Sequence, residues 1–88
     1  MNIYVSDGDN HVIRKQSMVD GVVRVIAGTM GTSYGYAGAT PTGDGGPATL
    51  ANLYYPKQMF LDRYGNLYVA VEYHHNIRKI SPQGIIST

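Results

Sequence analysis

Short apolar runs separated by turn-forming residues recur along most of the chain. The runs IYVS, VVRVIA and LYVAV are rich in β-branched and aromatic residues, which favour strands. VIRKQ and NIRKI alternate apolar and charged residues, a pattern typical of strands with one exposed face. DGDN, MVDG, RYGN and PQG interrupt the runs with residues that favour turns. The pattern predicts strands at residues 3–6, 12–16, 22–27, 57–62, 67–71, 76–80 and 85–88.

The chain contains an internal repeat. Residues 2–17 and 66–81 are identical at eight of sixteen positions when they are aligned without gaps. Such self-similarity indicates an architecture built from repeated units. The second copy has an additional predicted strand in front of it, which RYGN joins to the next strand as a tight hairpin. We therefore expect a four-stranded unit, of which the first copy lacks the leading strand.

The stretch GDGGPAT (43–49) lies between the two copies and concentrates glycine, aspartate and proline. We interpret it as a structural turn. Its glycines permit positive φ, its aspartate can bond neighbouring backbone N–H groups, and its proline directs the chain towards a short helical turn within 48–53. The residues assigned to this turn are Gly43, Asp44, Gly45, Gly46 and Pro47. A phosphate-binding loop fits less well, because no lysine follows the glycines and no buried strand leads straight into a helix.

Composition narrows the functional classes. Seven lysines and arginines face six acidic residues, and this near-neutral balance argues against a strong electrostatic grip on nucleic acid or anionic membrane. The absence of cysteine excludes disulfides and thiolate metal sites within the chain. No apolar run approaches the roughly 20 residues that span a bilayer, so no membrane insertion is expected. The first ten residues do not resemble a signal peptide, and the localisation stays open.

Together these motifs resemble the NHL repeat. DGDNHVIRK belongs to the first matching segment, residues 2–15, whereas YPKQMFLDRYGNLYVA and HHNIRKISPQG belong to the second, residues 56–84. The segment between them resembles the long inter-blade connector of many NHL proteins. The resemblance implies a β-propeller, in which four-stranded blades pack radially around a channel.

The resemblance predicts an all-β chain made of β-propeller blades of four antiparallel strands, named A to D. Residues 1–27 are expected to form a partial blade with strands B, C and D, residues 28–55 a connector, and residues 56–88 a complete blade. Because both ends fall within blade material, we expect a fragment of a longer NHL protein, with a ring-completing homo-oligomer as the alternative. Val71 and His74 replace the aspartate and asparagine of the first copy, so the bonds of the B–C turn should differ between blades.

Two stretches invite a metal-binding interpretation, and both fit poorly. DGDNHVIRKQSM (7–18) begins like a calcium loop, but its sixth and twelfth positions hold valine and methionine instead of glycine and glutamate. The histidines are His11, His74 and His75, of which the first and third occupy equivalent repeat positions. No third ligand of suitable geometry accompanies them, so neither a metal nor another cofactor is expected.

Recurrent or individual polar side chains define a candidate interaction surface. An Arg-Lys pair recurs in strand C of each copy, and adjacent side chains in a strand point to opposite faces. Tyrosines of the connector suit an interaction or stacking surface, with packing between blades as the other interpretation. The residues of this surface are Arg14, Tyr34, Tyr36, Glu72, Tyr73, His74, His75 and Arg78. If Arg78 and Lys79 are exposed, replacing either with alanine should leave folding nearly intact.

No set of nucleophile, base and acid stands out, so the chain is predicted not to be an enzyme. The expected function is a non-catalytic scaffold or interaction module for a protein, glycan or other ligand, with neighbouring blades or like chains covering its open edges. One alternative is part of a propeller enzyme, a metal-dependent lyase or hydrolase, whose site would lie in other blades, because strand A begins here with Lys57 and Gln58 and offers no ligand. The other is a self-assembling structural protein. Nucleic acid is not an expected partner.

Overall fold

The computed structural model describes residues 2–29 and 43–88, which form two antiparallel sheets. Within each sheet, short turns and single-turn helices join consecutive strands. The strands of the first sheet, in chain order, are β1 (Asn2–Asp7), β2 (Val12–Ser17) and β3 (Val23–Gly28). Those of the second are β4 (Pro56–Leu61), β5 (Leu67–Val71), β6 (Asn76–Ile80) and β7 (Ile86–Ser87).

This architecture confirms the all-β class and the two blade-like units, one of three strands and one of four. Antiparallel sheets whose strands follow chain order are the repeating unit of β-propellers. Every strand end lies within one residue of its predicted position. The last strand is shorter than predicted at both ends, and Ile85 forms an isolated bridge with Pro47 instead.

The internal repeat reappears in the backbone path of the turns. The 3-10 helix η1 (Gly8–Asn10) follows β1, and η3 (Glu72–His74) follows β5. Each is followed by a histidine in the left-handed region, with φ of 61° at His11 and 56° at His75. Because this conformation is uncommon for residues other than glycine, its recurrence shows that the two B–C turns fold alike.

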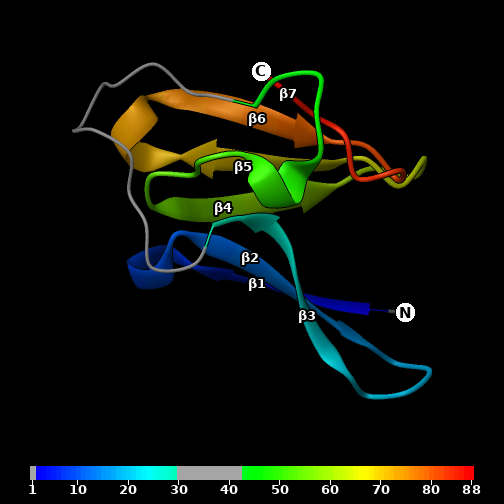
Figure 1. Cartoon of the computed structure of the whole chain (residues 1–88). Helices are drawn as coiled ribbons and strands as arrows, with labels where there is room; N and C mark the ends of the chain where they lie inside the picture. Colours follow the sequence, from blue (N-terminus) through cyan, green and yellow to red (C-terminus); the bar gives the residue numbers. More distant parts are fainter. Residues whose placement is uncertain (1, 30–42) are drawn as a thin grey trace.

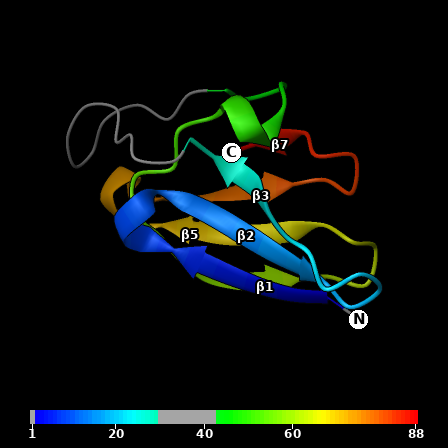
Figure 2. The same ribbon diagram turned by 60° about the horizontal axis from the view of Figure 1, so that its bottom comes forward.

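The two sheets lie face to face, with β1 next to β4 (Figures 1 and 2). β3 ends beside η2 (Ala48–Leu50), the single-turn helix that precedes β4. A tight turn joins β4 to β5, as predicted for a hairpin. There the Asp62 carboxylate accepts hydrogen bonds from the backbone N–H groups of Tyr64 and Asn66, each at 2.9 Å.

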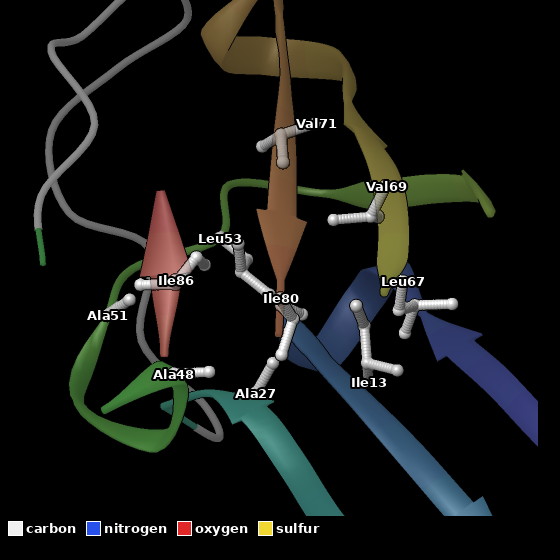
Figure 3. Close-up of a cluster of buried hydrophobic side chains, with 10 residues drawn as sticks. All are labelled: Ile13, Ala27, Ala48, Ala51, Leu53, Leu67, Val69, Val71, Ile80 and Ile86. Carbon is white, nitrogen blue, oxygen red and sulfur yellow. The ribbon is translucent and has the colours of Figure 1, made fainter. Parts of the chain in front are cut away.

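One apolar core fills the space between the sheets and the segment before β4 (Figure 3). In β5, every second side chain is buried, as expected for a strand with one face in the core. Figure 3 shows Ile13 of the first sheet next to Leu67 of the second, and Ala27 next to Ile80. The shared core fixes the position of one sheet relative to the other. Its residues are Ile13, Ala27, Ala48, Ala51, Leu53, Leu67, Val69, Val71, Ile80 and Ile86.

Candidate functional site

The GDGGPAT stretch lies along the edge of β7. The Gly45 N–H donates to the Ile86 carbonyl at 2.7 Å, and the Ile86 N–H donates to the Gly46 carbonyl at 3.0 Å. The Ala48 N–H donates to the Gly84 carbonyl at 2.8 Å. The chain before β4 therefore continues the ladder of the sheet that follows it in sequence. This pairing covers an edge that would otherwise be open to association.

Two of the three glycines in this stretch have the positive φ expected of turn glycines, and the third does not. Gly43 and Gly45 have φ of 91° and 84°, whereas Gly46 is not among the residues with positive φ. A Cβ at Gly43 would also lie 2.7 Å from the Cβ of Ala51, so the position requires glycine for space as well as for conformation. Pro47, with φ of −62°, leads directly into η2.

Asp44 is the polar centre of the connector. Its Oδ1 accepts a hydrogen bond from Arg78 Nη2 at 2.7 Å, and its Oδ2 accepts one from Thr88 Oγ1 at 2.8 Å. The hydrogen bond from Thr88, followed by that from Arg78, lowers the pKa of the Asp44 carboxyl. The expected contacts of Asp44 with neighbouring backbone N–H groups are replaced by these two side-chain contacts, which tie the connector to β6 and to the residue after β7.

Arg78 is buried, which corrects its expected place on an exposed surface. Its side chain is 0% exposed. Besides the contact with Asp44, its Nη1 donates to the Asn52 carbonyl at 3.0 Å. The reason is the direction of the side chain: Arg78 pairs with Val69 and shares the face of the sheet that the connector covers. Arg14, its equivalent in β2, is half-buried, and its Nε lies 3.4 Å from Asp7 Oδ2.

His11 links the first sheet to the segment before β4. Its Nδ1 accepts a hydrogen bond from the backbone N–H of Tyr55 at 3.1 Å, across 44 positions of sequence. Its ring also meets the ring of Tyr54 edge-on, with centroids 5.4 Å apart. The backbone of His11 is in the left-handed region, with φ of 61°, and its N–H donates to the Gly8 carbonyl at 3.1 Å. His11 therefore connects the first sheet to the residues just before β4.

His74 is buried as well, so it too leaves the expected exposed surface. Its Nε2 lies 3.5 Å from Asn52 Nδ2, and its ring packs edge-on against Tyr54 with centroids 5.9 Å apart. Burial, followed by the charges of Arg78 and His75, lowers the pKa of His74. The uncharged imidazole is therefore the form that suits the folded chain.

The other residues of the predicted interaction surface are either exposed or outside the described part of the chain. Glu72 and His75 are exposed, and Glu72 Oε2 forms an ion pair of 2.9 Å with Lys57 Nζ. Tyr34, Tyr36 and the side chain of Tyr73 lie outside the described part of the chain. The structure thus places two of the predicted surface residues fully at the surface and two others in the interior.

Within residues 2–29 and 43–88, no three His, Cys, Asp or Glu side chains come together as a metal site would require. The same ranges contain no helix with the length and apolarity needed to cross a membrane.

We expect the free energy of unfolding to decrease as the pH falls through about 6.5, because of His74. Its pKa is lowered in the folded chain, so the unfolded chain takes up a proton at this residue first. Linkage then favours unfolding below the ordinary histidine pKa and has no effect well above it. Urea denaturation at about pH 7.5 and about pH 5.5 measures the difference.

The variant His74→Gln is the control for this pH dependence. It removes the titrating ring and retains a side-chain amide that can bond to Asn52. Most of the pH difference should disappear with it. The aspartates with lowered pKa titrate below about pH 4 and lie outside this window. An unchanged pH difference in the variant would contradict the assignment to His74.

Three important contact residues carry no sequence signal of their own. Asn52 supplies a carbonyl to Arg78, Tyr55 supplies an N–H to His11, and Thr88 supplies a hydroxyl to Asp44. Each lies in a loop or at a strand end, and each is at least 26 positions away from its partner. Only the packing of the two sheets brings these groups together.

Two chain-ordered antiparallel sheets that share a core define the chain as a pair of β-propeller blade units. The sequence profile of the Teneurin NHL domain matches residues 1–88, the whole chain. The chain therefore belongs to the Teneurin NHL domain family, which confirms the resemblance to NHL repeats. A comparison with curated proteins gave no match.

Proposed function

We propose that the chain is a non-catalytic scaffold segment of an NHL β-propeller that displays interaction surfaces for a protein or glycan partner. The observation that carries this proposal is that its motif residues connect the segment before β4 to both sheets. Arg78 and Asp44 bind the connector to the second sheet, and His11 binds the first sheet to the connector. The side chains of Arg78, Asp44 and His11 thus form structural contacts. A catalytic site would need such side chains to point together towards a substrate.

The exposed ends of the turns are the surfaces that such a scaffold would offer. Glu72 and His75 lie at the B–C turn of the second blade, the end of the blade at which the first blade carries Asp9 and Asn10. All four side chains are exposed, and Glu72 stands where the first blade has Gly8. A shared turn backbone that carries different side chains suits recognition of a partner.

The variants His11→Asn and His75→Asn test the scaffold role, because the two histidines occupy equivalent turns. Asparagine tolerates the left-handed conformation, so the backbone of both turns should persist. His11→Asn removes the acceptor of the Tyr55 N–H and should lower the free energy of unfolding by about 1–2 kcal/mol. The exposed His75 should tolerate the change within about 0.5 kcal/mol.

The same two variants distinguish the scaffold from a metal-dependent enzyme. If these histidines bind metal, calorimetric titration with zinc should show saturable heat that both variants abolish, with little change in stability. A scaffold shows the asymmetric stability effect and no such heat. A zinc-dependent heat signal together with equal stability of both variants would overturn the proposal.

A further inference from the structure

A small pocket of about 140 Å³ lies between the two sheets, beside the turns that join β4 to β5 and β6 to β7 (Figure 1). These turns are close together, since a Cβ at Gly65 would lie 3.1 Å from Pro82 Cγ. All three strands of the first sheet line one side, whereas β5, β6 and the two turns line the other. Its lining includes Tyr4, Lys15, Ile26, Leu67, Ile80 and Pro82.

The side chains that line this pocket from the core are apolar. Leu67 and Ile80 are each 4% exposed and belong to the core, and Ile26 packs against them. Tyr4 also packs against the core and brings a ring and a hydroxyl to the pocket. An apolar cavity of about 150 Å³ is known to hold a benzene molecule. The space between the sheets is therefore large enough for a compact apolar group of one ring.

Lys15 brings a positive charge to the pocket. Ile13, two positions earlier in β2, belongs to the core, so Lys15 also faces the second sheet. Its side chain is half-buried. Residues 2–29 and 43–88 contain all six acidic residues of the chain, and no ion pair within these ranges includes Lys15. Asp62, the acidic residue of the β4–β5 turn, accepts hydrogen bonds within its own turn.

We propose that this pocket binds a small organic anion, a carboxylate attached to one flat or branched apolar group. The apolar group fills the space beside Leu67 and Ile80, and the carboxylate pairs with the Lys15 ammonium. Such a pair is strong where the surroundings are partly apolar, because charges are screened less there than in water. Tyr4 is paired with Lys15 in the register and carries a hydroxyl, which can donate to a carboxylate oxygen.

Titration of the isotope-labelled 88-residue chain with sodium benzoate at constant ionic strength, followed by NMR, tests this site. For a ligand of this size we expect a dissociation constant of about 1 mM. The backbone amides of Gly65, Leu67, Ser81 and Gly84, which line the pocket, should shift and then saturate. Benzyl alcohol has the same ring without the charge and should bind at least about tenfold more weakly.

Three variants assign the charge to Lys15. Lys15→Met keeps an unbranched side chain and removes the ammonium, so it should weaken benzoate binding at least about tenfold and leave benzyl alcohol unaffected. Lys15→Arg keeps the charge and should retain most of the affinity. Lys79→Met is the matched control, because Lys79 is the repeat equivalent of Lys15 but is exposed on the face of the second sheet turned away from the first. It should bind benzoate like the unmodified chain.

Four results would overturn the anion site. They are no saturable shift up to about 20 mM benzoate, shifts confined to amides away from the pocket, equal affinity for benzyl alcohol, and equal affinities of Lys15→Met and Lys79→Met for benzoate. The first three are read on the unmodified chain, so they do not depend on the folding of any variant. The scaffold proposal is tested separately, by the unfolding of the histidine variants.

Discussion

Replacing Arg78 with alanine is expected to lower the free energy of unfolding by about 3 kcal/mol. The guanidinium is fully buried and donates to the Asn52 carbonyl and to the Asp44 carboxylate. Its removal leaves a buried carbonyl without this donor and opens a cavity beside Val69. Since small domains are stable by only about 5–15 kcal/mol, the urea midpoint should fall clearly.

Lys79→Ala is the matched control for Arg78→Ala. The two residues are adjacent in β6, but the side chain of Lys79 points to the opposite face and is exposed. Its loss should change the free energy of unfolding by no more than about 0.5 kcal/mol. Small effects were expected of both substitutions if both side chains were exposed, and the burial of Arg78 removes that condition for one of them. Equal midpoints for the two variants would show that the buried contacts contribute nothing to stability.

Gly28→Ala should destabilise the chain by a similar amount, about 3 kcal/mol. Gly28 ends β3 with φ of 84°, a conformation unfavourable for alanine. A Cβ there would lie 2.2 Å from the carbonyl oxygen of His11 and 3.0 Å from the Cα of Val12. Both contacts are with backbone, so relief requires β2 and β3 to separate. Urea denaturation followed by circular dichroism measures the loss.

Gly84→Ala is the control that separates the cost of positive φ from the cost of the steric clash. Gly84 has nearly the same φ, 82°, but a Cβ there meets nothing within 4 Å. Its replacement should cost only the conformational term, about 1 kcal/mol. The difference between the two variants then measures the steric clash at Gly28. If Gly28→Ala lowers the free energy of unfolding no more than Gly84→Ala does, then Gly28 has more space beside the His11 carbonyl than the 2.2 Å contact implies.

Local patterns in the sequence were sufficient to predict the strands. Alternating and β-branched runs, with turn residues between them, placed every strand end within one residue. The hairpin at Asp62 to Asn66 is held by hydrogen bonds between neighbouring residues, and the short helical turn directly follows Pro47, so both leave a signal in the local sequence. The NHL motifs then supplied the family, because several of them occur in order along the chain.

The candidate site was less predictable, because exposure depends on which sheet face is covered. Arg14 and Arg78 look alike in sequence, yet only Arg78 lies beneath the connector. His74 and His75 are adjacent, yet one is buried against Tyr54 and the other is exposed. The residues around Arg78 and His74 do not reveal which distant segment of the chain covers them.

The sequence by itself determined the strands and the turns, which depend on residues close together in the chain. It also determined the repeat and the family, which show in the order of residues along the chain without any contact between them. Only the tertiary structure decided that the GDGGPAT stretch pairs with β7 and that Asp44 binds Arg78, 34 positions away. It likewise decided that His11 receives the Tyr55 N–H across 44 positions. These contacts form when two sheets bury a common apolar core, and that packing determines which polar groups meet.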